Sequence, residues 1–451
     1  MVADRVPVRV ERGAGDGLWT LVAPPWSLSE PVVSADRVHV LVDGRPTACD
    51  RADGTVLWQS AYRCLEDEWI ATLAPEGGPV VVVSGLPDGY HPVRLRIAVL
   101  DPASGAVNWQ TETDGSARYW ADGESLVLRE PAPADRETLS DGQDPPLRLT
   151  VLDLADGARR WQHTFTWIGS AALVQGRVLA QVRAGDDFTA RAFDARTGAE
   201  LWSRTGCIGS FHLPNDGPRP GEPPFFVWNW IDDRMRWLSL ATGEEVGEFR
   251  IVDRGPHGAR RPLITDGGHT VWLAGTGRTV HAFHPRAGSG RTAPAHVAYG
   301  LRHALTLGDG PIAAADGWLY AIDQGNRLVA ARVGLLPRSV LRPVRWPEHL
   351  SGPDYAADAF RGLSAGAQHV YAQTNPVAGP RSFQHVAALQ HGRVLWQLPC
   401  RYGTRVVPAG DRVLITTGDR SCDLLRMVDG ETGAFAGPDP AVAVADGPTV
   451  G

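Results

Sequence analysis

Lysine is absent from this chain of 451 residues, so all 44 of its basic residues are arginine. Neither a Schiff-base lysine nor the lysine of a phosphate-binding loop can therefore exist. The formal net charge of −7 is mild for this length, whereas nucleic-acid and anionic-membrane surfaces are basic. We expect neither a nucleic acid nor a membrane as partner.

Cysteine is scarce, and catalytic or metal-binding motifs are missing. The five cysteines follow no C-x-x-C spacing, which excludes a disulfide framework or a zinc site recognisable from spacing; they are Cys49, Cys64, Cys207, Cys400 and Cys422. The 14 histidines form no H-E-x-x-H motif, and neither a G-x-S-x-G elbow nor a glycine-rich phosphate loop occurs. We expect no metal and no cofactor.

Long apolar runs are also missing. The first residues form no apolar signal-peptide core, and no run reaches membrane-spanning length. These absences predict a soluble, cytoplasmic protein. The 51 glycines and 35 prolines favour many turns over long helices.

A repeated turn motif stands out in the remaining sequence. An Asp is followed by a Gly four residues later and by a Trp eight residues later, in four copies: Asp50/Gly54/Trp58, Asp101/Gly105/Trp109, Asp153/Gly157/Trp161 and Asp194/Gly198/Trp202. The Asp carboxylate can accept hydrogen bonds from backbone amides two residues on, and the Gly can adopt the positive φ that closes a hairpin. The Trp is expected to be buried between neighbouring sheets, with its indole N–H bonded to a backbone carbonyl.

Weaker copies extend this pattern along the chain. Trp19 follows Glu11 and Gly15 at the same offsets, while Trp396 ends a unit with a shortened turn. The first complete unit predicts strands at about 31–35, 37–42, 45–50 and 55–60. From residue 237 to 334 the motif decays, and the connection from Leu335 to Asp358 does not fit it.

The spacing of the copies predicts an all-β fold. Four short strands fit each interval, which indicates a single β-propeller of four-stranded blades. Eight blades are favoured, with seven or nine possible. The N-terminal strands should pair with the 405–437 segment and close the ring, which would remove exposed strand edges. We expect one domain over residues 1–437 and a C-terminal tail over 438–451.

The stretch from Ala192 to Trp202 resembles the repeat of the pyrroloquinoline-quinone-type β-propellers. That superfamily includes quinoprotein alcohol dehydrogenases and the propeller lipoprotein of the outer-membrane assembly machinery. The resemblance is strong over 31–204 and weak over 237–334. It implies that the tryptophans dock one blade on the next at Trp58, Trp109, Trp161, Trp202 and Trp396.

The two known branches fit this chain poorly. The dehydrogenases bind a quinone and Ca²⁺ beside a vicinal disulfide, but the sequence contains no adjacent cysteine pair and no clear set of Glu, Asn and Asp ligands. The assembly factor is periplasmic and lipid-anchored, and no lipobox-type signal is visible here.

Candidate functional residues lie in the connections that lead into each inner strand. In propellers these connections gather on one face around the central channel. The set is rich in aromatic, His and Arg side chains, which suit recognition, although several could simply fill a narrow channel. Its members are Trp26, Glu68, Trp69, Arg118, Tyr119, Trp120, Trp167, Phe211, His212, His257, His303, Arg361, Arg401 and Tyr402.

Two functions remain open at this point. A non-catalytic scaffold would use this face to bind a protein, with Trp69, Trp120, Trp167, Arg361, Arg401 and Tyr402 as binding candidates. An enzyme or small-molecule binder, with a role in a biosynthetic pathway as one option, would use a pocket at the channel mouth. Its acid/base candidates are Glu68, His212 and His303.

Overall fold

A computed structural model describes the chain in segments. The described residues are 8–12, 18–23, 28–29, 31–34, 36–64, 69–73, 78–88, 91–132, 145–184, 187–206, 211–212, 225–228, 234–250, 263–265, 271–274, 279–284, 295–300, 312–315, 318–322, 328–332, 342–344, 360–366, 368–374, 383–401, 404–418 and 423–436.

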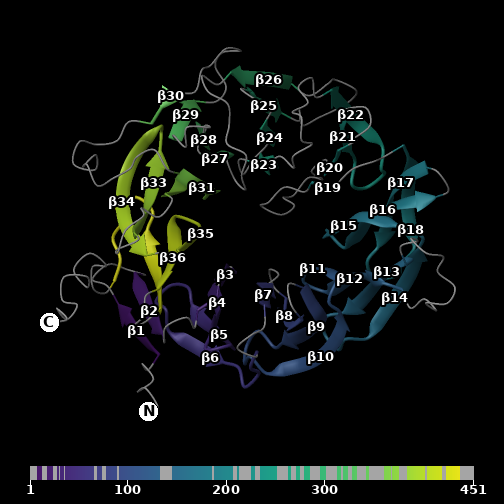
Figure 1. The fold of residues 1–451 in the computed structure, drawn as a ribbon, viewed down its shortest axis with the longest axis horizontal. Helices are drawn as coiled ribbons and strands as arrows, with labels where there is room; N and C mark the ends of the chain where they lie inside the picture. Colours follow the sequence, from purple (N-terminus) through teal and green to yellow (C-terminus); the bar gives the residue numbers. More distant parts are fainter. Residues whose placement is uncertain are drawn as a thin grey trace.

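The described residues form an all-β structure without a helix. Their strands make nine antiparallel sheets, eight with four strands and one with five. Figure 1 shows the sheets following one another around a common centre, and in the four-stranded sheets of the N-terminal half the first strand lies on the inner side and the last on the outer side. The all-β structure and the four-stranded antiparallel sheets are those that the repeat predicts.

The strands of the first four sheets in chain order come from the part with the regular motif. They are β3 (Val32–Val33), β4 (Arg37–Val42), β5 (Arg45–Asp50) and β6 (Val56–Gln59); β7 (Trp69–Leu73), β8 (Val80–Asp88), β9 (His91–Leu100) and β10 (Val107–Asp114); β11 (Arg118–Ala121), β12 (Ser125–Pro131), β13 (Leu147–Asp153) and β14 (Arg159–Phe165); and β15 (Ile168–Val174), β16 (Arg177–Ala184), β17 (Asp187–Asp194) and β18 (Glu200–Thr205).

The next four sheets follow in order. They are β19 (Phe211–His212), β20 (Phe225–Trp228), β21 (Arg234–Leu238) and β22 (Glu245–Arg250); β23 (Leu263–Thr265), β24 (Val271–Ala274), β25 (Thr279–His284) and β26 (Ala295–Gly300); β27 (Ile312–Ala315), β28 (Trp318–Ile322), β29 (Leu328–Arg332) and β30 (Arg342–Pro343); and β31 (Phe360–Ala365), β32 (Val370–Thr374), β33 (Phe383–Gln390) and β34 (Arg393–Arg401).

The five-stranded sheet combines the two ends of the chain. It contains β35 (Arg405–Ala409), β36 (Arg412–Gly418) and β37 (Asp423–Asp429), followed by β2 (Trp19–Ala23) and β1 (Arg9–Arg12). Strand β2 pairs with β37 from Thr20 opposite Arg426 to Ala23 opposite Asp423. Strands from both ends of the chain thus share one sheet.

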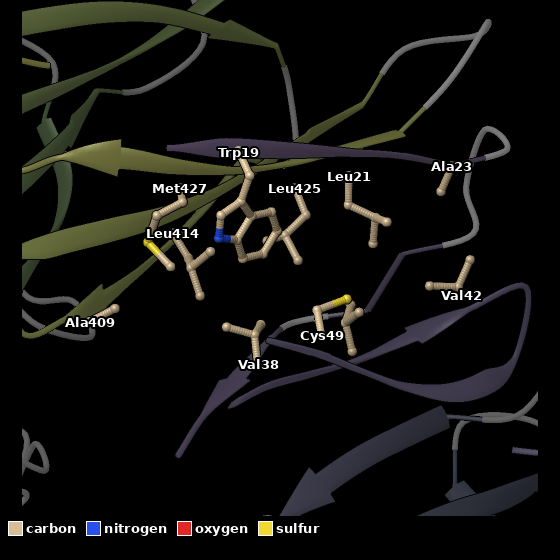
Figure 2. Close-up of a cluster of buried hydrophobic side chains, with 11 residues drawn as sticks. Trp19, Leu21, Ala23, Val38, Val42, Cys49, Ala409, Leu414, Leu425 and Met427 are labelled. Carbon is tan, nitrogen blue, oxygen red and sulfur yellow. The ribbon is translucent and has the colours of Figure 1, made fainter. Parts of the chain in front are cut away.

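The core between this sheet and the β3–β6 sheet contains side chains from both ends of the chain. Trp19 and Leu21 of β2 are fully buried against Leu425 and Met427 of β37 and against Val38 of β4 (Figure 2). Burial of this much apolar surface is the main stabilising contribution to the contact between these sheets.

Each motif Trp docks on the Gly of the next sheet's turn. Trp58 lies against Gly105, and Trp202 lies against Gly243. These glycines have φ near +70°, and a Cβ added there would collide with the indole. The pattern extends to Trp19 on Gly54, Trp109 on Gly157, Trp161 on Gly198 and Trp396 on Gly433.

The indole N–H bonds the same backbone position in every case. The acceptor is the carbonyl of the residue that follows the first residue of the turn, at 2.8–3.0 Å. The acceptors for Trp19, Trp58, Trp109, Trp161, Trp202 and Trp396 are Arg51, Pro102, Leu154, Ala195, Leu240 and Gly430. Trp58, Trp161, Trp202 and Trp396 are 7–8% exposed, whereas Trp109 is only partly buried. The predicted docking role is confirmed.

A β-bulge precedes five of these six tryptophans on the outer strand of their sheet, and Trp19, the first residue of β2, is the sixth. In the fourth sheet Ala192 pairs with Trp202 and Phe193 with Glu200, so Leu201 has no partner across the ladder. The same shift occurs before Trp58, Trp109, Trp161 and Trp396. An extra residue bends the outer strand, and we infer that this bend turns the Trp toward the neighbouring sheet.

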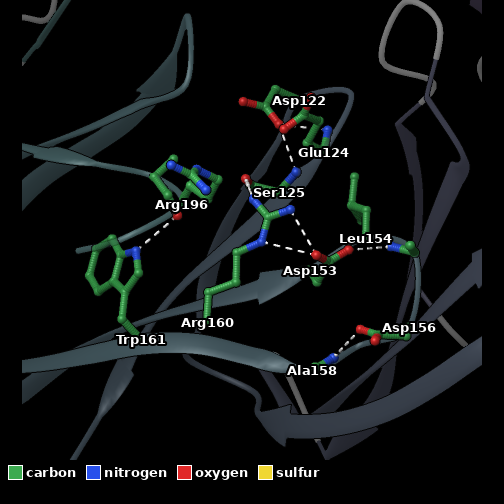
Figure 3. Close-up of polar contacts among 12 residues, drawn as sticks. Asp122, Glu124, Ser125, Asp153, Leu154, Asp156, Ala158, Arg160, Trp161 and Arg196 are labelled. Atoms are coloured by element: carbon green, nitrogen blue, oxygen red, sulfur yellow. Dashed lines mark hydrogen bonds and ion pairs between the residues drawn. The ribbon is translucent and has the colours of Figure 1, made fainter. Parts of the chain in front are cut away.

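The Asp of the motif forms the expected turn contacts. Asp153 accepts from the amide of Ala155 at 2.8 Å and from both Nε and Nη2 of Arg160 at 3.1 and 2.8 Å (Figure 3). Arg160, the bulged residue here, also donates to Ser125 Oγ at 2.8 Å. One guanidinium therefore connects β12, the turn and the outer strand.

The decayed part of the chain differs from the sequence-based expectation. The connection from Leu335 to Asp358 contains β30, which serves as the fourth strand of its sheet. This strand carries no Trp, and Trp318 of β28 instead lies against Gly392 of the next sheet. Tyr320 supports the contact, since its hydroxyl accepts from the Gly392 amide at 3.0 Å.

Candidate functional site

Two of the expected binding residues, Trp120 and Trp167, lie at the junction of the β11–β14 and β15–β18 sheets. Trp120 lies in the middle of β11, and Trp167 is the residue just before β15. Trp120 packs against the buried cluster that contains Ile168 and Ala171 of β15. Both indoles are only partly buried, so each keeps part of its ring accessible to solvent.

This junction lies at the edge where the chain passes from one sheet to the next. Residues 115–117 lead into β11, and residues 166–167 lead into β15. The motif turns, such as Asp194–Gly198, lie at the opposite ends of their strands, because neighbouring strands are antiparallel. We call these two sides the connection edge and the turn edge.

Trp167 is held in place by three neighbours. Its ring covers the backbone of Gly169 so closely that a Cβ there would collide with it. The ring of Phe188 in β17 meets the Trp167 ring edge-on, with 5.3 Å between centroids and 80° between planes. The Trp167 carbonyl accepts from the Arg183 amide at 3.3 Å. The indole is therefore a positioned surface group.

Arg129 brings a positive charge to the same place. Its Nη1 donates to the Gly169 carbonyl at 2.8 Å, so Arg129 and Trp167 contact the same residue. Its Nε is buried and has no hydrogen-bond partner among the described residues. Burial, together with the nearby charge of Arg118, lowers the pKa of the Arg129 guanidinium below its usual value.

Arg118 lies directly opposite Arg129 on the β11–β12 ladder. Cross-strand partners point to the same face of a sheet, as does Trp120 two residues after Arg118. Arg118 is exposed, and no ion pair within the described residues involves Arg118 or Arg129. We name Arg118, Trp120, Arg129 and Trp167 the Arg–Trp site.

The closest carboxylate along the strand does not neutralise this site. Glu130 follows Arg129 and so points to the opposite face of β12. There its Oε1 accepts from Arg148 Nη2 at 2.6 Å and Nε at 3.0 Å, and its Oε2 accepts from the Thr113 hydroxyl of the preceding sheet. Glu130 is buried and fully engaged, which leaves the two arginines on the other face without a counter-charge from it.

The other expected residues are only partly placed. Trp69, His212, Arg361 and Arg401 lie within or at the ends of strands β7, β19, β31 and β34, where the backbone is described and the side chains are not. Glu68, His303 and Tyr402 lie outside the described residues, as do Trp26 and His257. Tyr119, Trp120 and Arg361 were expected in loops, but they lie inside strands β11 and β31, because these inner strands begin earlier than the motif spacing suggests.

The sequence reasoning missed Arg129, Gly169 and Phe188. Arg129 could have been predicted from strand pairing, because a hairpin whose turn is centred near residue 123 places Arg129 opposite Arg118. Gly169 and Phe188 gave no local signal, because their roles depend on contacts with Trp167 across the sheet.

Three described titratable groups outside this site are buried in the sheets. Burial raises the pKa of the Cys49 and Cys400 thiols to about 12. Burial, with the charge of Arg37, lowers the pKa of His39 to about 4. Among residues with described positions, no group of three His, Cys, Asp or Glu side chains could hold a metal ion. No helix in this part of the chain is long and apolar enough to cross a bilayer.

A family comparison matches the N-terminal half of the repeat region. Residues 4–139 and 96–209 match the family model described as outer membrane protein assembly factor BamB. A curated relative, the serine/threonine-protein kinase AfsK of Streptomyces coelicolor, is 29% identical over 167 residues. That match covers 37% of this chain but 18% of the kinase, so the chain spans under a fifth of the length of this relative.

Solved structures with similar folds share little sequence with this chain. BamB from Moraxella catarrhalis is 13% identical with a TM-score of 0.43, covering 81% of this chain and 95% of that one. Hsv2 from Kluyveromyces lactis is 10% identical with a TM-score of 0.45, covering 71% and 98%. The quinohemoprotein alcohol dehydrogenase from Comamonas testosteroni is 13% identical with a TM-score of 0.44, covering 97% and 78%.

Proposed function

Because this chain belongs to the superfamily of pyrroloquinoline-quinone-type repeat β-propellers, we propose that it is a non-catalytic scaffold that binds a partner protein. The Arg–Trp site at the connection edge is the binding surface in this proposal. The observation that carries it is the convergence of Trp120, Trp167, Arg118 and Arg129 from two sheets, with both indoles partly exposed.

The residue types and their support suit recognition of a protein. Trp and Arg dominate the energetics of protein–protein interfaces, because they combine a large contact area with directed polar groups. Trp120, Arg118 and Arg129 lie on strands, and Trp167 is fixed by Gly169 and Phe188. A surface that is already ordered loses little conformational entropy on binding.

The proposal includes the arrangement of the whole ring. In this proposal each of the nine sheets is one blade of a single ring. The repeat spacing allowed seven, eight or nine blades, and nine is the largest of these numbers. The pairing of β2 with β37 would close that ring. Closure would keep the Arg–Trp site fixed, since each blade would be packed on both sides.

We further propose that the scaffold works in the cytoplasm. The described cysteines Cys49, Cys64 and Cys400 are buried and form no disulfide, which suits a reducing compartment. Fractionation of the source cells followed by immunoblotting tests the location, and recovery in an extracytoplasmic fraction would refute it.

Site-specific photocrosslinking tests the scaffold function. A photoreactive amino acid replaces Arg118 in one variant and Arg196, an exposed residue of the turn edge, in another. We expect the Arg118 position to yield a discrete crosslinked protein in living source cells, while the Arg196 position does not. No crosslinked protein from Arg118, or the same proteins from both positions, would overturn the proposal.

A further inference from the structure

The Arg–Trp site contains two cations that lie together without a described counter-charge. Arg118 and Arg129 are direct cross-strand partners, and like charges in that arrangement destabilise a sheet. Burial of the Arg129 guanidinium adds a desolvation cost, which its single described acceptor, the Gly169 carbonyl, offsets only in part. Such an arrangement gains free energy when an anion binds between the two groups.

We propose that this site binds carboxylate side chains of an acidic segment in the partner protein, an inference that rests on the proposed scaffold function. Guanidinium groups match carboxylates in geometry and can donate two parallel hydrogen bonds to each. The Nε of Arg129 is shielded from solvent, and Nη1 already donates to the Gly169 carbonyl, so the remaining guanidinium nitrogen, Nη2, is the donor expected to contact the ligand. Exposed Arg118 is accessible to the same ligand.

The aromatic neighbours favour a protein segment over other anions. Trp120 and Trp167 present partly exposed apolar rings beside the two guanidiniums, and Phe188 extends the ring pair of Trp167. A peptide that places an aromatic or aliphatic residue next to its carboxylates can use both surfaces. Free phosphate and the phosphates of a nucleic acid backbone have no apolar part that these rings could contact.

Peptide binding provides the test with the intact protein. The probes are a fluorescein-labelled Glu-Glu-Phe-Glu-Glu-Phe peptide and its Gln-Gln-Phe-Gln-Gln-Phe counterpart, measured by fluorescence anisotropy at low and high salt. We expect the acidic peptide to bind and the neutral one not to bind. Because a hydrogen bond to a charged group is involved, Arg118→Ala should weaken binding about tenfold. Arg118→Glu should abolish binding.

Matched variants separate the site from general charge effects. Arg196→Glu makes the same change in net charge at the turn edge and should leave peptide affinity unchanged. Arg129→Gln should also weaken binding, while circular dichroism reports whether the fold is kept. Because Arg118 is exposed, its variants are expected to fold, and they test the inference even if Arg129→Gln does not fold.

Several outcomes would overturn the inference. These are equal binding of both peptides, no binding of either, an equal effect of Arg196→Glu, or tighter binding of a single-stranded oligonucleotide. If Arg118 crosslinks to a partner protein but the acidic peptide fails, the scaffold function stands and the acidic specificity is wrong. If the crosslinking fails, the scaffold function itself is wrong.

Discussion

At the scale of single residues, the motif tryptophan is the contact between neighbouring sheets that recurs along the chain. Trp202 combines three interactions: it is 8% exposed, it covers Gly243, and its N–H donates to the Leu240 carbonyl at 3.0 Å. The Gly has φ of +69°, so no other residue fits both the turn and the indole without strain. Trp and Gly in successive sheets therefore depend on each other.

Trp202→Ala should lower the free energy of unfolding by about 3–5 kcal/mol, the usual range for truncating a buried aromatic residue. Leu201→Ala is the matched control, since this bulged neighbour is 45% exposed and should change stability by less than about 0.5 kcal/mol. Urea titration followed by circular dichroism measures both variants. Equal losses for the two variants would show that the Trp is not a core contact.

The sequence motif predicted these contacts well, but it could not predict Trp318. In that part of the chain the fourth strand is β30, Arg342–Pro343, and the docking position on Gly392 is filled from β28. This substitution depends on packing between sheets rather than on spacing along the chain. The bulges before Trp58 and Trp202 could not be predicted from the sequence either, because a bulge is a property of strand register.

At the scale of structural elements, the motif turns depend on ionised carboxylates. Asp194 accepts hydrogen bonds from the amides of Arg196 and Thr197 at 3.0 and 2.7 Å and from the Thr197 hydroxyl at 2.8 Å. The hydroxyl and amide of Thr197 hold the pKa of Asp194 below its usual value. Asp101 has a lowered pKa through Ser104, and Asp153 through the Ala155 amide and Arg160.

The turns should weaken in acid. A carboxyl whose pKa is lower in the folded state stabilises the fold above its unfolded pKa, and this contribution is lost as the pH falls through the folded pKa. The melting temperature should therefore fall as the pH drops below about 4, the unfolded value for Asp. The triple variant Asp101→Asn, Asp153→Asn and Asp194→Asn should show a flatter fall, because Asn accepts the same amide hydrogen bonds without titrating.

A matched control comes from the last turn. Glu431 contributes its backbone amide to the Asp429 carboxylate, while its own exposed side chain accepts none of the described turn hydrogen bonds. Glu431→Gln should leave the pH dependence of the melting temperature unchanged. Calorimetry over a pH series checks these variants, and a triple variant with the wild-type acid slope would contradict the role of the turns.

At the scale of the whole molecule, the Arg–Trp site exists only because sheets pack side by side. Arg118 and Trp120 come from one sheet and Trp167 from the next, and their neighbours Arg129 and Phe188 are not positions of the motif. The sequence could place Trp120 and Trp167 among the candidates through their position near inner strands. It could not pair them with Arg129, because that contact passes through the backbone of Gly169 on another sheet.

The two ends of the chain should stabilise each other. Strand β2 covers the edge of β37, and its Trp19 and Leu21 are fully buried in the core of Figure 2. Deleting residues 1–22 removes these side chains and leaves β37 with an unpaired edge, which is a template for pairing with other chains. We expect the truncated protein to aggregate and to melt at a lower temperature.

Deleting residues 438–451, predicted to form a tail beyond the propeller, should leave the fold and its melting temperature intact. Light scattering and thermal melting measure both truncations. A protein without residues 1–22 that stays monomeric and equally heat-stable would show that the pairing of β2 with β37 does not hold the two ends together.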